Sequence, residues 1–439
     1  MRLPRIFRRV ILASIGFAFA TQFSGGATRA AAPIAADNPR ASPLDRDVDR
    51  ALQPLFANHC HVGLSIAVVD RERTAFYDYG SVARDESRLP TPDSIYEIGS
   101  VTKSFTGALA AEAVVRHLMA LDTDFRQYLP EPYPNLAWRG RPITLRTLAT
   151  HRSGLPRDLP DTDDLYAHPD FETLPFQLIA RDAPYDHARY LRELRHVQLL
   201  SAPGSQELYS NLGVKVIGFG LEKVTGTSFE ALMRRNLLRP LAMTSTGFVV
   251  DARDESRLVV GFSRGGRRMP YRLRNAGAAY GLYSTARDMA KYLRWQLNET
   301  NPVVRLSHQP LLGDTTDGKG LIWNLGADAG GRRMLWHGGG TFGMTSQVVL
   351  YPDDREGFAL LANDTCKGTE SALKDIAATL HGELALATDS TPERGRPPAW
   401  PRSKSLILLA PGILTFPRKR PVQAGAVLPA ASSVQSDSM

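Results

Sequence analysis

The heptapeptide GSVTKSF, residues 99–105, places a serine and a lysine three positions apart directly after a glycine. Residues three apart on a helix lie on the same face, so the Lys103 amine can reach the Ser100 hydroxyl. That arrangement is typical of a nucleophile beside its base. The alternative is that Ser100 only caps a helix while Lys103 points to solvent. A second SxxK string, at Ser371 and Lys374, has the pattern of an ordinary surface helix, so position and neighbours must decide.

The residues after Ser100 predict a long helix. Apolar side chains recur there at helical spacing, which indicates a helix that begins at Ser100 and buries one face. The residues concerned are Val101, Phe105, Ala108, Leu109, Val115 and Met119. Ser100 would then lie at the positive end of the helix dipole.

The rest of the chain predicts an α+β fold. Residues 63–70 and 74–80 are β-type runs separated by charged residues, which indicates an antiparallel hairpin. Three further β runs come late in the chain, at residues 334–337, 345–351 and 357–363, and a helix with a stripe of Leu373, Ile376, Leu380 and Leu384 follows them. Between the two sets, roughly at residues 122–241, helical patterns and proline breaks predominate. We therefore expect a mostly helical subdomain inserted into a sheet domain.

The first 32 residues have the composition of a signal peptide. Four arginines in the first nine residues precede an apolar run from Val10 to Phe23, and small residues continue to Ala32. Arg8 and Arg9 fit a twin-arginine export signal, and ordinary export fits equally well. The apolar run is too short for a membrane span with such flanks. The sequence thus predicts a periplasmic or secreted protein with no stable membrane span.

The net charge of +8 does not indicate a nucleic-acid partner, because the charge lies at the two ends. Residues 1–32 carry five arginines and no acidic residue, and residues 391–439 carry seven basic and two acidic side chains. The body between them is close to neutral. The terminal segment, residues 391–439, is rich in Pro, Ala and Ser, which predicts a disordered tail. Its apolar stretch SLILLAPGILTF leaves a weak surface anchor as the alternative.

A metal site is not indicated. The chain contains no HExxH string and no paired CxxC. His59, Cys60 and His61 could ligate a metal, but neighbouring histidines in a loop are usually polar surface. We therefore expect neither a metal nor a cofactor.

Three strings at predicted element boundaries could instead face one cleft. They are SxxK at Ser100, the tripeptide YSN at residues 209–211, and His337 at the start of the glycine run 338–340. Each string alone is weak, since Asn211 could cap the next helix and His337 could lie in a turn. A second YxN string, at residues 133–135, lies in a proline-bracketed loop and does not fit this pattern.

With these residues the chain resembles the serine β-lactamase and DD-peptidase superfamily, on the class C β-lactamase branch. It is most similar to the D-alanyl-D-alanine carboxypeptidase/endopeptidase members. The resemblance covers about residues 45–388, through GSVTKSF, LATHRSGLPRDLP, PGSQELYSN, GLYSTARDM and HGGGTFG. It implies a β-lactamase/transpeptidase-like fold, in which an antiparallel sheet flanked by helices and a mostly helical domain enclose a cleft.

The resemblance also implies a role for each site residue. Ser100 would be the nucleophile, Lys103 and Tyr209 would share the proton transfers, Asn211, His337 and Gly339 would bind substrate, and the backbone amides of Ser100 and Gly340 would form the oxyanion hole. Lys103 can act as a base only if burial or neighbouring charges lower its pKa. A positive helix end and the nearby lysine would likewise favour ionised Tyr209.

The chain departs from the family at His337 and Gly338, where lactamases usually carry Lys and Thr. The missing hydroxyl removes one ligand for a substrate carboxylate, which puts efficient β-lactam hydrolysis in doubt. A histidine titrates near 6.5, so its positive charge would appear only as the pH falls. Carboxylate substrates should then bind better at lower pH, unless His337 merely contacts a backbone carbonyl.

The two cysteines of the chain, Cys60 and Cys366, precede the first long strand and follow the last one. In the family's sheet those strands are antiparallel neighbours, which implies a disulfide between the two residues. The alternative is a pair of unbonded thiols.

The sequence therefore predicts an exported serine acyl-hydrolase that acts through a Ser100 acyl-enzyme on D-alanyl peptides of peptidoglycan. The alternatives are a carboxylesterase of the same fold, a weak class C-like β-lactamase, and a penicillin-binding protein that does not hydrolyse its ligand. The expected partner is a small peptide, β-lactam or ester. The sequence gives no oligomeric state.

Overall fold

The computed structural model describes residues 34–271 and 277–389, and the fold lies in the unit that begins at Ala35. The expected signal peptide at residues 1–32 and the expected tail at residues 391–439 fall outside these ranges. Among the described helices, none has both the length and the apolar character needed to cross a bilayer.

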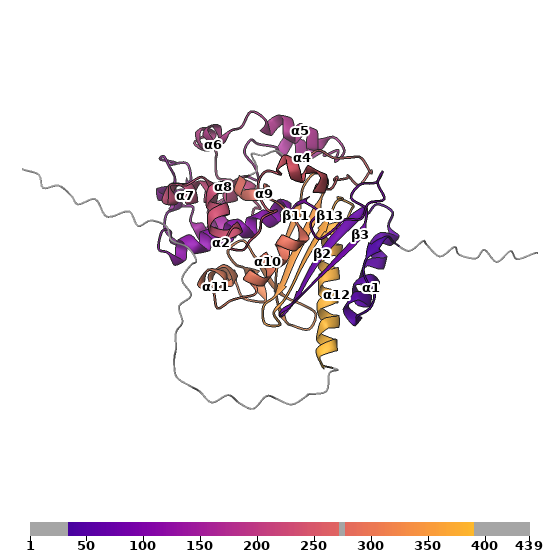
Figure 1. Ribbon diagram of the computed structural model, residues 1–439. Helices are drawn as coiled ribbons and strands as arrows, with labels where there is room; N and C mark the ends of the chain where they lie inside the picture. Colours follow the sequence, from indigo (N-terminus) through magenta and orange to yellow (C-terminus); the bar gives the residue numbers. More distant parts are fainter. Residues whose placement is uncertain (1–33, 272–276, 390–439) are drawn as a thin grey trace, which may run out of the picture. The chain divides into compact units, whose positions relative to one another are not determined.

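The centre of the fold is a nine-stranded antiparallel sheet with strand order β1-β3-β2-β13-β12-β11-β10-β9-β8 (Figure 1). Its strands are β1 (Ala36–Asp37), β2 (Gly63–Asp70), β3 (Arg73–Gly80), β8 (Leu312–Gly313), β9 (Asp317–Lys319), β10 (Asn324–Ala327), β11 (Arg333–Gly340), β12 (Thr345–Tyr351) and β13 (Glu356–Ala362). The hairpin and the three late strands expected from the sequence are all present. The first long strand, β2, pairs antiparallel with the last, β13, so that Leu64 lies opposite Ala362.

Helices cover both faces of this sheet, which explains its almost continuous apolar strands. Helix α10 (Ala286–Gln296) packs against β2 and β13. Helix α12 (Thr369–Asp389) packs against β12, and α1 (Pro43–Ala57) lies on α12. Every residue of β12 and β13 is buried as a result.

Residues 122–241 contribute mainly helices, as the sequence pattern indicates. Their elements are η2 (Phe125–Tyr128), the hairpin β5 (Ala137–Trp138) and β6 (Arg141–Pro142), α3 (Leu145–Ala149), α4 (Asp163–Ala167), α5 (Leu174–Asp182), α6 (His187–Leu194), α7 (Asn211–Thr225), α8 (Phe229–Met233) and η3 (Arg234–Leu238). Three further helical pieces follow, η4 (Ala252–Arg257), α9 (Gly277–Tyr280) and α11 (Pro302–His308). Helix α7 packs against α2 (Thr102–Val115).

The helix after Ser100 differs from the sequence-based prediction in two ways. A 3-10 turn, η1 (Gly99–Val101), carries Ser100, and the α-helix α2 begins afterwards and spans Thr102–Val115. Residues 102–113 are buried on every side rather than along one face. Helices α7, α8, α9 and α11 all pack against α2. Its many small residues permit this close packing, and a helix enclosed in this way shows no polar face.

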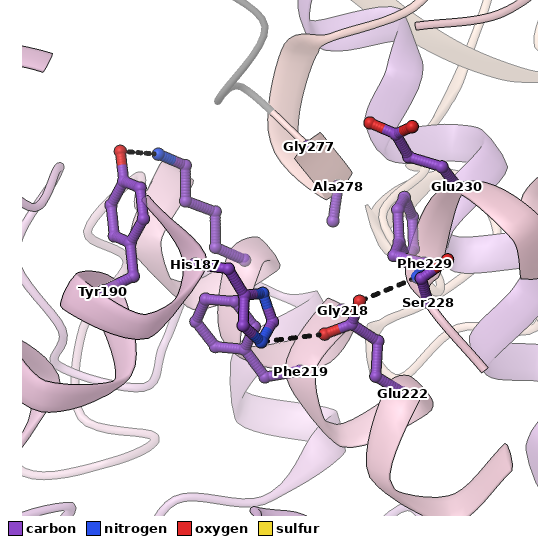
Figure 2. A pocket seen from close by; sticks show the side chains of 11 residues that line it. His187, Tyr190, Gly218, Phe219, Glu222, Ser228, Phe229, Glu230, Gly277 and Ala278 are labelled. Carbon is purple, nitrogen blue, oxygen red and sulfur yellow. Dashed lines mark hydrogen bonds and ion pairs between the residues drawn. The ribbon is translucent and has the colours of Figure 1, made fainter. Parts of the chain in front are cut away.

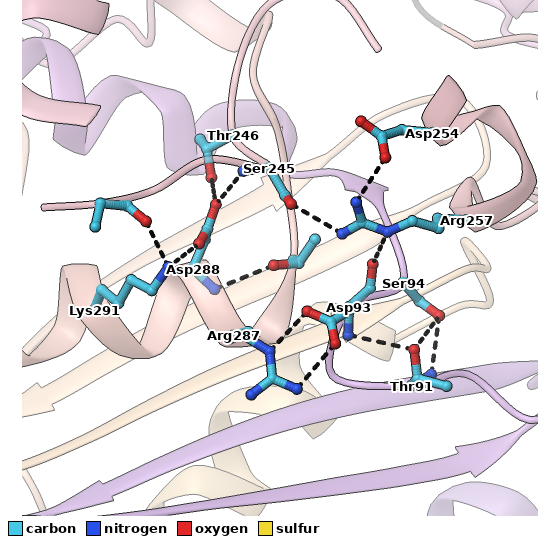
Figure 3. Close-up of polar contacts among 12 residues, drawn as sticks. Thr91, Asp93, Ser94, Ser245, Thr246, Asp254, Arg257, Arg287, Asp288 and Lys291 are labelled. Carbon is cyan, nitrogen blue, oxygen red and sulfur yellow. Dashed lines mark hydrogen bonds and ion pairs between the residues drawn. The ribbon is translucent and has the colours of Figure 1, made fainter. Parts of the chain in front are cut away.

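A polar network fixes the segment that leads into the Ser100 turn (Figure 3). Strand β4 (Tyr96–Glu97) pairs with β7 (Tyr283–Ser284) just before this turn. Arg287, in the first turn of α10, donates to both carboxylate oxygens of Asp93, at 2.7 and 2.9 Å. Arg257 donates to the Asp93 backbone carbonyl at 3.0 Å. The loop before β4 is thereby held to α10, and the position of Ser100 does not depend on the turn alone.

Cys60 and Cys366 form a disulfide, with their Cα atoms 6.0 Å apart. The bond spans 306 residues and lies where β2 begins and β13 ends. Closing so long a loop removes much of the entropy of the unfolded chain, an effect of up to about 5 kcal/mol.

Candidate active site

Ser100 and Lys103 lie in contact at the start of α2. The Lys103 Nζ atom is 2.9 Å from Ser100 Oγ and 2.7 Å from the Ala279 carbonyl oxygen. The Lys103 side chain is fully buried. The serine hydroxyl therefore has an amine beside it that bulk water does not surround, as a general base requires.

Tyr209 is the second group in contact with Ser100. Its phenol oxygen lies 2.8 Å from Ser100 Oγ. The next residue, Ser210, caps α7 by accepting a hydrogen bond from the Gly213 amide at 2.8 Å. The Ser210 amide in turn donates to Nδ1 of His151, whose ring lies 4.4 Å from the Tyr209 ring. The cap and the histidine together hold the YSN loop.

The protonation state of Tyr209 differs from the sequence-based expectation. Burial raises the pKa of Tyr209 to about 12, and the hydrogen bond between Tyr209 and Ser100 and the charge of Arg157 only partly offset this rise. The outer part of the residue still faces the cleft, with 37% of its surface exposed. Desolvation outweighs the positive surroundings because it acts directly on the phenolate oxygen. Tyr209 is therefore a neutral phenol, and a proton donor, near neutral pH.

Asn211 begins α7 and lines the cleft. Its Nδ2 atom donates to Asp158 at 3.0 Å, which fixes the amide. Its Oδ1 atom is buried and has no hydrogen-bond partner among the described residues. An unpartnered buried acceptor is unfavourable, so this oxygen is suited to accept a substrate N–H.

The end of β11 lies against the Ser100 turn. A Cβ atom built on Gly339 would overlap the Ile98 carbonyl oxygen and would lie 3.1 Å from the Ser100 nitrogen. Gly340 and Ser100 both line the cleft. The glycines thus bring two lengths of backbone together at the point where an oxyanion hole is expected.

His337 lies in β11 and is only 5% exposed. Burial and the nearby Lys103 lower the pKa of His337 to about 3, and its Nδ1 donates to the Gly338 carbonyl at 2.7 Å. The expectation that His337 titrates near 6.5 is therefore wrong. The ring stays neutral at physiological pH, because burial removes the water that would stabilise its charged form.

This neutral histidine should make the protein less stable in acid. Unfolded His337 takes up a proton below about pH 6.5 whereas folded His337 does not, so the free energy of unfolding falls as the pH falls toward 3. The expected contribution between pH 7 and 4.5 is about 2–3 kcal/mol. Urea unfolding of His337→Gln at the two pH values should show a correspondingly smaller loss. The same change at exposed His59 should leave the loss as in the wild type, and equal losses in all three proteins would contradict the prediction.

The cleft that holds these groups has a volume of about 400 Å³. Its lining includes Ser100, Tyr209, Asn211, His337, Gly338 and Gly340 together with Ala149, His151, Arg157, Tyr166, Glu207, Tyr280, Lys319, Ile322, Asn324 and Glu370. Tyr133 of the second YxN string and Ser371 of the second SxxK string do not line this cleft. The sequence analysis did not identify five of the lining residues, namely His151, Arg157, Glu207, Lys319 and Glu370. Gly338, which stands where lactamases usually carry Thr, is the one signal that could have indicated Glu370.

A second cavity, of about 440 Å³, lies on the other side of α9 (Figure 2). Ala278 lines this cavity, whereas Tyr280 lines the catalytic cleft. Four of its polar groups form two pairs, since Lys215 donates to the Tyr190 hydroxyl at 2.7 Å and His187 lies 3.6 Å from Glu222. Among the described residues of its lining, no hydrogen bond joins the Ser228 hydroxyl to a lysine or a tyrosine, in contrast to Ser100 in the cleft described above.

Two other groups of residues do not form catalytic sites. The string GFSRG at residues 261–265 matches the GxSxG pattern of many hydrolases. Ser263 is however 1% exposed and donates to Glu172 at 2.6 Å. His61, Asp364 and Cys366 lie close enough to share a metal, but the Cys366 sulfur is bonded to Cys60. Two donor atoms remain there, fewer than a structural zinc site needs.

Comparisons with known proteins agree with this geometry. The family model Beta-lactamase matches residues 48–383. The D-alanyl-D-alanine-carboxypeptidase/endopeptidase AmpH of Escherichia coli K12 is 26% identical over 361 residues, 77% of this chain and 90% of AmpH. A β-lactamase of Pseudomonas fluorescens is 28% identical over 261 residues, which are 58% of this chain and 64% of that protein.

The fold has a close counterpart among solved structures. A class C β-lactamase superposes with a TM-score of 0.65 at 20% sequence identity, over 78% of this chain and 96% of the lactamase. The antiparallel sheet, its covering helices and the helical region are shared, as the sequence resemblance implied. The chain therefore belongs to the β-lactamase family and is a hydrolase of the serine β-lactamase fold.

Proposed function

We propose that the protein is a serine acyl-hydrolase that forms an acyl-enzyme on Ser100 and cleaves D-alanyl peptides of peptidoglycan. The main support for this proposal is that Ser100 Oγ lies 2.9 Å from Lys103 Nζ and 2.8 Å from the Tyr209 phenol oxygen. A nucleophile in contact with two such groups can lose a proton to one of them while the other serves the leaving group.

The proposed reaction has two stages. Unprotonated Lys103 accepts the Ser100 proton while Oγ adds to the substrate carbonyl, and the amides of Ser100 and Gly340 stabilise the oxyanion. Neutral Tyr209 donates its proton to the departing amine or alkoxide, which leaves the acyl-enzyme with a protonated Lys103 and a Tyr209 phenolate. Water then attacks the ester carbonyl and gives a proton to the Tyr209 phenolate, while Lys103 returns its proton to Ser100 Oγ as the ester bond breaks, which restores all three groups. Asn211 Oδ1 accepts the substrate amide N–H.

The substrate class and location rest on the relatives and on the sequence. AmpH, similar over 77% of this chain, is named as a D-alanyl-D-alanine-carboxypeptidase/endopeptidase. The arginine-rich apolar segment at residues 1–32 supports export to the periplasm or the outside of the cell. Residues 45–388 would form the catalytic domain.

A carboxylesterase of the same fold is the second candidate. The neutral His337 and the absence of a hydroxyl at Gly338 favour it, because both weaken recognition of a substrate carboxylate. A weak β-lactamase and a penicillin-binding protein without turnover are further outcomes of the experiment that follows.

The test compares a D-alanyl-D-alanine pentapeptide, a β-lactam and a short-chain p-nitrophenyl ester with the wild type, Ser100→Ala and, as a matched control, exposed Ser205→Ala. We expect wild type and Ser205→Ala to turn over at least the peptide or the ester, and mass spectrometry to find the acyl adduct in both. Ser100→Ala should lose turnover and adduct alike. If Ser100→Ala keeps full activity on all three compounds, Ser100 is not the nucleophile.

A further inference from the structure

Glu370 occupies a part of the catalytic cleft that only a glycine at position 338 leaves open. It belongs to the first turn of α12 and lines the same cleft as Ser100. A Cβ atom built on Gly338 would overlap Glu370 Oε1 and would lie 2.7 Å from Glu370 Cδ. The carboxylate therefore fills the volume that a side chain at position 338 would take.

The negative charge of Glu370 is not balanced within the cleft. The two cations of the lining have acidic partners, because Arg157 lies 3.6 Å from Asp158 and Lys319 lies 2.8 Å from Glu207. Among the residues that the structure describes, no hydrogen bond or ion pair reaches the Glu370 carboxylate. Glu370 as a whole is exposed, but partial desolvation of its carboxylate in the cleft raises its pKa, and the Lys374 ammonium offsets this rise only in part.

A second acceptor faces the same corner. Gln347 lies opposite Gly338 in the β11–β12 pairing and is 1% exposed. Its Oε1 atom has no partner in the described part of the chain and would lie 2.9 Å from a Cβ atom on Gly338. Two acceptors at one place repel a carboxylate and are complementary to an N–H donor or a cation.

We propose that Glu370, backed by Gln347, is a specificity-determining residue that favours substrates whose leaving group carries a cation or an N–H donor and disfavours leaving groups that end in a carboxylate. This inference rests on the proposed function, because it concerns the leaving group of the same acyl transfer. Within the D-alanyl class, it favours internal peptide bonds over bonds to a C-terminal residue with a free carboxylate.

Three acetate esters test the proposal, with 3-carboxyphenol, phenol and 3-(trimethylammonio)phenol as leaving groups. The ratio of kcat/KM for the cationic ester to that for the anionic ester should fall about tenfold in Glu370→Gln. Comparing one ratio between variants cancels the intrinsic reactivity of the esters. The control is Asp375→Asn, which removes the same charge from an exposed position on α12 and should change the ratio less than twofold. Equal ratios in Glu370→Gln and the wild type would overturn the proposal.

A second measurement needs no variant. Rising salt should lower the cation-to-anion ratio of the wild type, because it screens a charge at a cleft open to solvent. A cation-to-anion ratio near that of the uncatalysed reaction, and unaffected by salt, would also overturn the proposal.

Hydrolysis of phenyl acetate by Ser100→Ala separates the proposal for Glu370 from the proposed function. If hydrolysis requires Ser100 but the ratio does not respond to Glu370, the subsite alone is wrong, whereas hydrolysis without Ser100 rejects the proposed function itself.

Discussion

Replacing Lys103 with methionine should lower kcat/KM for ester hydrolysis by about a thousandfold, as expected for loss of the general base. Methionine fills a similar volume in a fully buried position but cannot accept the Ser100 proton. Lys103→Arg should be nearly as inactive, because the guanidinium keeps the positive charge and does not deprotonate in proteins. The measurement is kcat/KM for a p-nitrophenyl ester at several pH values, with the folded state checked by circular dichroism.

Lys215 offers a matched control. It is also a buried lysine, and its Nζ lies 5.3 Å from the Tyr280 ring, while Lys103 Nζ lies 5.7 Å from the same ring. Its amine donates to Tyr190 rather than to Ser100. Lys215→Met therefore should not reproduce the loss of activity in the folded protein. If Lys103→Arg retained most of the wild-type activity, Lys103 would act through its charge and not as a base.

Gly339→Ala should lower kcat/KM by about a hundredfold or more, because a misplacement of about 1 Å at a reacting centre has an effect of this size. The added methyl group would overlap both the Ile98 carbonyl and Ser346 Oγ, which are joined by a 2.8 Å hydrogen bond. Strand β11 would then have to move away from the turn that carries Ser100. The free energy of unfolding should fall by about 1–3 kcal/mol, the usual effect of overpacking.

Gly340→Ala is the control for stability, since a Cβ atom at that position would meet nothing within 4 Å. Its free energy of unfolding should stay within about 0.5 kcal/mol of the wild type. Urea denaturation measures stability and ester hydrolysis measures activity. Full activity in folded Gly339→Ala would show that the close approach of β11 to the Ser100 turn is not needed for catalysis.

Local sequence patterns predict those parts of the fold that depend only on residues close together in the chain. The hairpin at residues 63–80 follows from β-type runs around a charged turn, and α7 follows from its helical spacing. The complete burial of α2 could not be predicted in this way. Whether the second face of a helix meets solvent or another helix depends on segments far away in the chain, here α9 and α11.

The same limit applies to the site. Short motifs in the sequence identify Ser100, Lys103 and Tyr209. Ser100 and Lys103 are recognised by their spacing, and Tyr209 by the resemblance of its tripeptide to a family motif. Glu370 has no such mark, since its place in the cleft depends on α12 lying over β11 and on the missing side chain at Gly338. The pKa of His337 depends on burial and on a lysine more than 200 positions away, so residue type alone gave the wrong value.

The pairing of β2 with β13 has a consequence for the order in which the chain can fold. β2 is the first long strand to be made and β13 the last strand, yet they are neighbours in the sheet. Until residues near 360 have been synthesised, β2 has an open edge whose amide and carbonyl groups could pair with another chain. Contacts over such sequence separations make folding slow. A chain cut short before Glu356, the first residue of β13, should therefore aggregate rather than form a smaller sheet, whereas removal of residues beyond α12 should leave the nine described strands in place.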